Sequence, residues 1–260
     1  MALANGLLVH GPTHWAAAVR EDDGRLVVAS GRKLVMRAGP LDRMPLVRGL
    51  ARIGEAFAVL PMVRRALPQA RFAMEDGRAA TVAGAATVAA IVLRRRTRSV
   101  LGQEAIGAVM GLAPALVTLR GSRAAVWHAV EHKSIAAYEA GGPAGVARAA
   151  DQAKEHTRCG SNLILPLLVS TVLGNTLARR LPLRRIPGAR TLVSALSIGA
   201  AVEVFAFAAR RPRHLLSRVV HGTGHAMQAG FVTREPTADE LVVGRAAMDA
   251  LVQAETGLRP

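Results

Sequence analysis

The spacing of apolar residues changes several times along the chain, and each change predicts a different element. In the first part, short apolar stretches alternate with turn formers, and Asp23-Gly24 separates two of these stretches, 15–19 and 26–29. An Asp-Gly pair in this position is typical of the turn in a β-hairpin. We therefore expect residues 1–44 to form a small β-rich cap.

Apolar residues between Pro45 and Leu67 recur every three to four positions, and arginines are set among them. This period predicts a basic amphipathic helix within the segment 45–78. Such a helix suits a membrane surface, a partner helix or ordinary packing within the protein.

Four longer apolar runs follow and pair into two hairpins. They cover 79–93, 105–119, 163–178 and 191–209. The first two have about fifteen residues, so as helices they span roughly 22 Å, less than the roughly 30 Å hydrocarbon core of a bilayer. They would cross a thinned bilayer or dip into it and return, whereas the last two are closer to full spans. We expect a short apolar helical hairpin over 79–119 and a transmembrane helical hairpin over 161–209. The predicted fold class is mainly α: a helical membrane bundle of two to four spanning or re-entrant helices with the small N-terminal cap.

Because each hairpin returns to its starting side, the segments 1–78, 120–160 and 210–260 are expected on one face of the membrane. The lysines and arginines close to the ends of the runs do not decide which face this is. Residues 1–6 lack the basic region and apolar core of a cleavable signal peptide. We therefore expect a multi-pass protein of the cell inner (cytoplasmic) membrane, with its large segments in the cytoplasm.

The composition supports a membrane protein with basic flanks. Lys and Arg total 34 against 18 acids, giving a net charge of +16, yet the mean hydropathy is positive at +0.26. Arginines cluster at the ends of the apolar runs and aromatic residues make up only 3%, so the basic platform of a nucleic-acid binder is not indicated. The expected partners are a lipid bilayer with anionic head groups and another membrane protein, with no nucleic acid.

Glu203 lies inside the last apolar run, where a charge is costly in lipid. We expect it to face the interior of the bundle and to meet an arginine or histidine there. A hydrogen bond that packs helices together and a role in chemistry are both compatible with this position.

The clearest chemical signal is the sequence His128-Ala129-Val130-Glu131-His132, which has the H-x-x-E-H pattern of inverted zincins. On a helix, His128 and His132 fall on one face about 6 Å apart, and two imidazoles so placed can hold one metal ion. Glu131 lies near enough to act as a general base on a water bound to that ion, or to orient an imidazole. The alternative is a solvated histidine pair on an alanine-rich helix.

His156 and Cys159 are the candidates for the remaining ligands of a tetrahedral site. The turn formers at 141–143 predict a short return to a second helix over 147–158, which would bring this pair back toward the first. Imidazole and thiolate ligands favour zinc. The expected cofactor is therefore a divalent metal ion, zinc by ligand type.

Four further residues are expected around these ligands or at the rim of the site: Lys133, Glu139, Arg158 and Asn162. Glu139 lies about 16 Å along the helix axis from His128, so the two cannot share an ion. Glu139 would orient the mouth of the site, or pair with Lys133 or Arg148 in water.

The segment 210–260 is expected to be a soluble helical tail. His221 and His225 are four residues apart, but Gly222 and Gly224 argue against a regular helix there. Further on, Thr237 is predicted to cap a final helix, with Glu240 as its partner in a capping box.

Taken together, these motifs resemble the bacterial YqhQ-like membrane proteins, the family of domain of unknown function 1385, whose members are often labelled metal-dependent enzymes. The resemblance rests on Val130-Glu131-His132-Lys133-Ser134-Ile135 with Tyr138-Glu139, on His156-Thr157-Arg158-Cys159-Gly160-Ser161-Asn162 and on Thr233-Arg234-Glu235-Pro236. An apolar-Gln element of the family is represented by Met227-Gln228. The resemblance implies a membrane protein with a metal-dependent activity and names no substrate.

Two functions are compatible with these residues. The first is a membrane-embedded metal-dependent hydrolase with Glu131 as its catalytic base. If all four histidine and cysteine ligands bind, however, the metal site is closed, and closed sites are structural. The protein would then be a non-catalytic membrane adaptor or scaffold. A transporter or channel is less well supported, because few apolar runs carry a charge.

Overall fold

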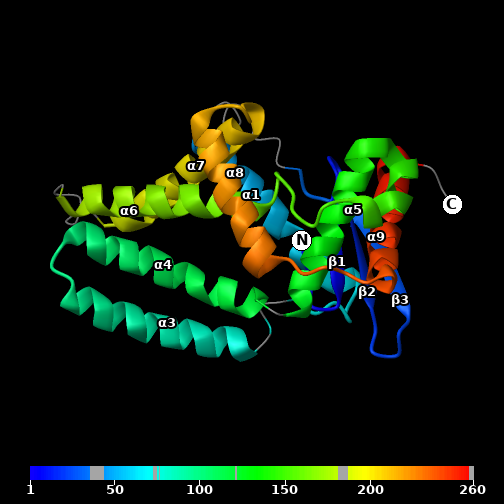
Figure 1. Ribbon diagram of the computed structural model, residues 1–260, viewed down its shortest axis with the longest axis horizontal. Helices are drawn as coiled ribbons and strands as arrows, with labels where there is room; N and C mark the ends of the chain where they lie inside the picture. The colour runs from blue at the N-terminus through cyan, green and yellow to red at the C-terminus, as the bar shows by residue number, and fades with distance from the viewer. Residues whose placement is uncertain (36–43, 73–74, 76, 121, 181–186, 258–260) are drawn as a thin grey trace.

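A computed structural model describes residues 1–35, 44–72, 75, 77–120, 122–180 and 187–257 (Figure 1). Two parts of the predictions, the end of the cap at 36–43 and the tip of the second hairpin at 181–186, lie outside these residues.

The N-terminal cap is a three-stranded antiparallel sheet in the order β1-β2-β3. Its strands are β1 (Gly6–His10), β2 (His14–Arg20) and β3 (Leu26–Arg32). Ala17 of β2 lies opposite Leu8 on one side and Ala29 on the other. Gly24 takes a positive φ of 86° in the turn between β2 and β3, a conformation that favours glycine. The predicted hairpin with its Asp-Gly turn is confirmed.

Both faces of β1 and β2 are buried, which explains why these two strands carry apolar residues at consecutive positions. One face packs through Leu7 and Val9 against α5 (Arg123–Gly145) and α9 (Ala238–Thr256). The other packs through Leu8 against Val59 and Val63 at the break between two short helices. The sheet therefore forms the base against which α5, the helix of the candidate site, is held.

Segment 45–78 contains two helices where one continuous amphipathic helix was predicted. They are α1 (Val47–Ala58) and α2 (Leu60–Ala66), and α2 has Pro61 in its first turn. Proline lacks a backbone N–H and is tolerated there but not in a helix interior, so the chain starts a new helix.

The apolar runs form two helical hairpins, α3 (Gly77–Arg96) with α4 (Val100–Leu119) and α6 (Ile164–Arg180) with α7 (Ala189–Arg210). Three segments within the described residues are long and apolar enough to cross a membrane: Val100–Val117, Gly160–Arg180 and Thr191–Arg210. Helices α3 and α4 have 20 residues each, longer than the predicted runs, because their polar and basic flanks continue the helix. The predicted helical membrane bundle is confirmed.

The two hairpins extend in the same direction, away from the sheet (Figure 1). The end of α3, the start of α4 and the end of α6 lie at one end of the molecule, and α5, α9 and the three strands lie at the other. This arrangement places the candidate site outside the apolar part of the bundle.

Acidic residues inside the bundle are paired with arginines. Glu203 of α7 accepts a hydrogen bond from Arg48 Nε at 2.6 Å, which ties α1 to the bundle as predicted for this acid. Near the hairpin tips, Glu104 of α4 contacts Arg94 at 3.0 Å and Arg179 at 2.9 Å, and so joins three helices. These pairings remove the cost of an isolated charge at apolar depth.

The expectation of an irregular segment around Gly222 and Gly224 is wrong, because both lie within a regular helix, α8 (Leu215–Met227). A Cβ atom on Gly224 would lie 2.0 Å from Asn162 Oδ1, so this glycine lets α8 approach the segment that follows the candidate ligands. The space beside Gly222 is open. Close packing, rather than helix breaking, accounts for Gly224.

The predicted helix over 147–158 is also wrong. A 3-10 turn, η3 (Val146–Asp151), ends well before Cys159, and another, η4 (Gly160–Leu163), leads into α6. The segment between them has no regular secondary structure. Further on, the capping box between Thr237 and Glu240 is present at the start of α9, as predicted.

Candidate metal centre

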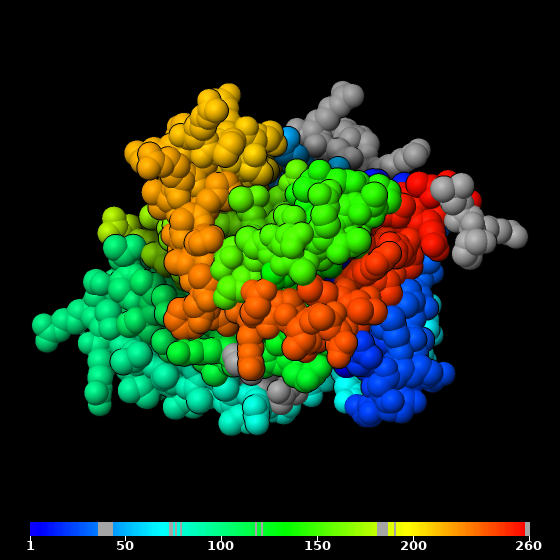
Figure 2. Space-filling view, turned by 45° about the vertical axis from the view of Figure 1, so that its right-hand side comes forward, coloured from blue at the N-terminus to red at the C-terminus, as the bar shows by residue number. Residues whose placement is uncertain are grey.

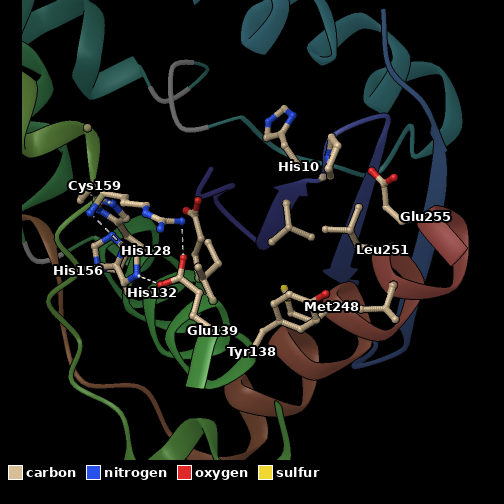
Figure 3. A pocket seen from close by; sticks show the side chains of 18 of the residues that line it. His10, His128, His132, Tyr138, Glu139, His156, Cys159, Met248, Leu251 and Glu255 are labelled. Carbon is tan, nitrogen blue, oxygen red and sulfur yellow. Dashed lines mark hydrogen bonds and ion pairs between the residues drawn. The ribbon is translucent and has the colours of Figure 1, made fainter. Parts of the chain in front are cut away.

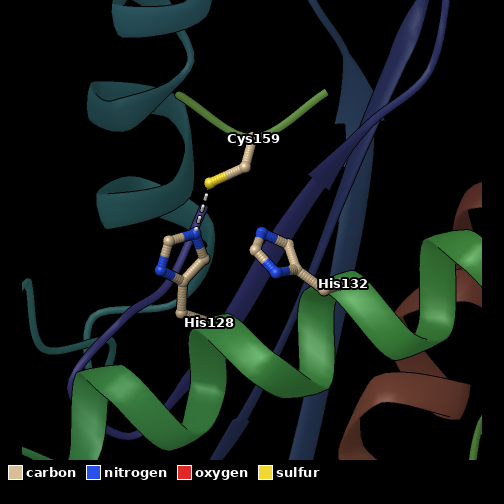
Figure 4. Close-up of side chains that lie close together, drawn as sticks. All are labelled: His128, His132 and Cys159. Carbon is tan, nitrogen blue, oxygen red and sulfur yellow. Dashed lines mark hydrogen bonds between the residues drawn. The ribbon is translucent and has the colours of Figure 1, made fainter. Parts of the chain in front are cut away.

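Helix α5 places His128 and His132 on the same face, with their ring centroids 4.4 Å apart (Figure 4). The helix is fixed by Trp127, which is fully buried and donates a hydrogen bond from Nε1 to Ala4 O at 3.2 Å. His132 itself is 4% exposed. The two imidazoles therefore project from a rigid, buried helix rather than from a solvated one.

Cys159 reaches the same point from the segment between η3 and η4. Its Sγ lies 3.2 Å from His128 Nε2 (Figure 4). His128, His132 and Cys159 each offer one ligand atom to this point, and these three atoms lie within 4.8 Å of one another. Ligands of a tetrahedral zinc site, at bond lengths of 2.0–2.3 Å, are separated by roughly 3.3–3.8 Å. The three side chains could therefore hold a metal ion after only small adjustments.

Backbone carbonyls set the orientation of both imidazoles. His128 Nδ1 lies 3.0 Å from Val232 O, and His132 Nδ1 lies 2.6 Å from Lys154 O. A carbonyl oxygen only accepts, so each Nδ1 carries the proton and donates it. In the neutral imidazoles the lone pairs are therefore on Nε2. This is the arrangement by which proteins orient metal-ligating histidines.

The pKa of the Cys159 thiol is lowered to about 5. Burial alone would raise it, but hydrogen bonds from His128 and His132 and the charges of these two rings outweigh burial. The pKa of His128 is raised in turn: burial opposes the increase, and the hydrogen bond and charge of Cys159 produce it. The cysteine is thus held as the thiolate, the form that binds metals.

His156, the fourth predicted ligand, lies beside the cluster formed by His128, His132 and Cys159. Its ring centroid is 5.8 Å from that of His132, and its Nε2 is 3.2 Å from Glu139 Oε2. Glu139 also accepts a hydrogen bond from Arg158 at 2.7 Å. Of the two alternatives for Glu139, the pairing with Lys133 or Arg148 is not what the structure contains, because the segment 152–159 returns along this end of α5 and places His156 and Arg158 beside this carboxylate.

Glu131 and Lys133 face different surroundings from each other. Glu131 forms an ion pair with the amino group of Met1. Burial alone would raise the pKa of Glu131, but the Met1 amino group and the charges of His128 and His132 outweigh burial and lower this pKa, so the carboxyl is ionised.

Lys133 donates to Ala150 O at 3.1 Å and Gln152 O at 2.7 Å, and thereby holds the end of η3. Its role in the structure is to fix the start of the segment that carries Cys159.

Two buried side-chain amides, those of Asn162 and Gln228, hold the backbone around Cys159 in place through hydrogen bonds. Asn162 donates from Nδ2 to Thr157 O at 2.9 Å and to Cys159 O at 3.3 Å. Gln228 accepts from His156 N at 2.7 Å and donates to Ser161 Oγ at 2.8 Å. Sequence reasoning placed Asn162 near the site but did not assign a role to Gln228. No local spacing signals it, since 72 residues separate it from His156.

The π-helical turn that follows α8, η6 (Gln228–Val232), thus supports the site at both ends. Gln228 holds the backbone before Cys159, and Val232 O holds the His128 ring. Lys154, whose carbonyl oxygen orients the His132 ring, also contacts η6, because its side chain donates a hydrogen bond to Ala229 O at 3.3 Å. Short π-helical turns often occur at functional sites, and this one positions two of the three candidate ligands.

A cavity of about 490 Å³ adjoins the cluster (Figure 3). Cys159, His128 and His132 lie together at one end, Glu131 also lines the cavity, and Tyr138, Met248 and Leu251 form part of its walls. His10 also lines the cavity; burial lowers its pKa to about 4, with the Met1 amino group adding to the decrease. The neutral ring leaves its Nε2 without a hydrogen-bond partner among the described residues.

A comparison with known protein families finds a match over the part of the chain that carries the candidate metal centre. The family model described as "Protein of unknown function (DUF1385)" matches residues 121–254, a range that begins just before α5 and ends within α9. No curated protein and no solved structure matches the chain. The matched range contains His128, His132, Cys159 and the supporting Gln228. Because it covers more than half of the 260 residues, the chain belongs to the DUF1385 family, as its resemblance to the YqhQ-like proteins indicated.

Proposed function

We propose that this membrane protein is a zinc-dependent hydrolase whose metal ion is held by His128, His132 and Cys159. The observation that carries the proposal is the convergence of the three ligand atoms at the end of a cavity. Three protein ligands leave the fourth tetrahedral position for water or substrate, as catalytic zinc sites require. Thiolate with imidazole favours zinc over the harder divalent ions.

Zinc in this position would supply Lewis acidity and lower the pKa of a coordinated water to about 7. The residues of the chain prepare the site for this chemistry. Val232 and Lys154 hold the imidazoles in orientation, and the histidines keep Cys159 ionised. Glu131 is the proposed general base, since its carboxyl is ionised and lines the cavity. Its ion pair with the Met1 amino group would open as it accepts a proton.

The hydrogen bond between His156 and Glu139 lies at the cavity wall. We assign it a positioning role, because the nitrogens of His156 already interact with Glu139 and with the Arg158 N–H. Arg158 is 71% exposed and stands at the rim of the cavity, where it suits an acidic or carbonyl group of a substrate. His10 Nε2 is a second polar contact available to a substrate.

The non-catalytic adaptor is the main competing function. In one form of it the histidine and cysteine side chains are a hydrogen-bonded cluster with a structural role; in the other they form a closed metal site, with His156 as the fourth ligand. Two features oppose the closed site: His156 is engaged by Glu139, and the cluster opens onto a cavity rather than being sealed. A cysteine hydrolase is the second candidate, because Cys159 and His128 form a close pair with a lowered thiol pKa. Such a pair is also how cysteine nucleophiles are activated.

The membrane setting is part of the proposal. We place the protein in the cell inner membrane, with the site at the cytoplasmic face and the basic flanks of the spans on anionic head groups. The arginines at the ends of α3, α6 and α7 support the contact with anionic head groups. The exposed apolar faces of the three candidate spans also permit a membrane-protein partner.

The hydrolase proposal is tested with detergent-purified protein and a panel of chromogenic carboxylic and phosphoric esters. We expect turnover that a chelator removes and zinc restores, with Glu131→Gln retaining zinc but losing most activity. Cys159→His distinguishes the two catalytic candidates, because histidine replaces a metal ligand but cannot replace a thiol nucleophile. Activity of Cys159→His with bound zinc supports the metal enzyme. Chelator-resistant turnover that Cys159→His abolishes supports the cysteine hydrolase instead.

A further inference from the structure

Helix α8 presents apolar side chains to the outside of the molecule. Leu215 is 72% exposed, Leu216 43% and Val219 50%. They lie within about 100° of one another in helical projection, so they form one stripe. Ser217, Val220 and Gly224 are buried on the other side of the helix. Figure 2 shows α8, in orange, open to the surface along its length.

Basic residues surround this stripe. The sequence from Val204 to Arg234 contains no acid but carries Arg210, Arg211, Arg213 and Arg218. Arg211 stacks on the Phe207 ring at 5.7 Å, and none of the ion pairs of the described residues involves Arg211, Arg213 or Arg218. A helix with an apolar stripe and flanking arginines is suited to a membrane surface with anionic lipids.

The position of α8 in the fold also suits a helix at the membrane surface. It begins five residues after Arg210, where the candidate span Thr191–Arg210 ends. It then runs across the direction of α4 and α6 rather than parallel to them (Figure 1). A helix that follows a span directly and turns across the bundle lies close to the plane of the membrane.

We propose that α8 is an interfacial helix that lies in the head-group layer of an anionic membrane. Leu215, Leu216 and Val219 enter the boundary with the acyl chains, and the arginines contact lipid phosphates. The opposite side of α8 packs through Gly224 on Asn162, three residues after Cys159. The candidate metal centre is thereby held within about one helix diameter, roughly 10 Å, of the head groups. This inference does not depend on a bound metal or on hydrolysis.

The test uses full-length Cys159→Ser protein in nanodiscs, with one nitroxide label on Val219→Cys and, in a matched protein, on Val242→Cys. Val242 is 52% exposed on α9, away from the bundle, and serves as the aqueous control. Electron paramagnetic resonance measures the accessibility of each label to oxygen and to a water-soluble nickel complex. In phosphatidylcholine discs containing phosphatidylglycerol, we expect oxygen to be favoured at 219 and the nickel complex at 242.

Removing phosphatidylglycerol, or replacing Arg213 and Arg218 by glutamate, should shift the 219 label toward the aqueous pattern while 242 does not change. Nickel-favoured accessibility at 219 in anionic discs would overturn the proposal. Low accessibility of the 219 label to both reagents would also overturn it, because the stripe would then be covered by a second copy or another part of a protein.

Discussion

Cys159 Sγ lies 3.2 Å from His128 Nε2, although 31 residues separate them in the sequence. The contact exists because α5 is fixed on the sheet and because buried amides fold the following segment back onto it. Nothing else among the described residues gives Cys159 a strong partner besides the two imidazoles and the Ser161 N–H. The contact between Cys159 and His128 therefore sets the ionisation of the thiol and of this imidazole.

The lowered pKa of Cys159 predicts how the metal-free thiol reacts with an alkylating reagent. The thiolate is the reactive form, so with a pKa of about 5 it is already fully formed at pH 6.5. The iodoacetamide rate should be nearly constant from about pH 6.5 to 9 and fall as the pH drops through 5. In His128→Ala the hydrogen bond is lost and the pKa rises, so the rate should climb through this range. A rising rate in the unsubstituted protein would contradict the predicted thiolate.

Gly222 and Gly224 offer a matched pair of substitutions on one helix. Gly224→Ala places a methyl group against Asn162, so we expect destabilisation by about 1–3 kcal/mol. Gly222→Ala meets open space and improves helix propensity, so we expect stabilisation of up to roughly 1 kcal/mol. Thermal unfolding in one detergent measures both. Equal effects would show that α8 does not pack on Asn162 as described.

Gln228 is expected to control metal affinity without being a ligand. Gln228→Leu leaves His156 N and Ser161 Oγ without their partner and loosens the turn that carries Cys159. Loss of such supporting contacts typically costs 10–100-fold in metal affinity. We expect zinc affinity to fall by about this factor, measured by competition with a chromogenic chelator. Gln253→Leu, on the exposed side of α9, is the control and should bind zinc like the unsubstituted protein.

The arrangement of the hairpins predicts membrane sidedness. Single cysteines at the exposed Ser30, Ala147 and Thr256, in a Cys159→Ser background, should all react with an impermeant maleimide from one side. A cysteine at Arg98, between α3 and α4, should react only from the other side if this hairpin crosses the bilayer. Reaction of Arg98→Cys from the same side as the other three would show that α3 and α4 dip and return.

Features that depend on local sequence were predictable. The Asp23-Gly24 turn, the Thr237 cap and the apolar runs are each encoded within a few residues, and the structure contains all three. The pairing of Glu203 with an arginine also followed from general physics, since an acid at apolar depth needs a partner. The H-x-x-E-H spacing was enough to put two imidazoles on one face of α5.

Features that depend on contacts between distant segments were not predictable. The path from η3 to Cys159 is irregular because its backbone is satisfied by Gln228 and Asn162 rather than by helical hydrogen bonds. A helix was therefore predicted where there is none, and His156 pairs with Glu139 instead of completing the cluster. In α8, packing against Asn162 overrides the low helix propensity of two glycines.

The metal content of purified protein tests the central claim most directly. Protein extracted in mild detergent without chelators is analysed for metals beside His132→Ala and a control, His225→Ala, whose histidine is exposed on α8. We expect about one zinc ion per chain in the unsubstituted protein and in His225→Ala, and a loss of most of it in His132→Ala. Absence of metal from the unsubstituted protein even after incubation with zinc, or equal zinc in all three proteins, would contradict a metal centre at His128, His132 and Cys159.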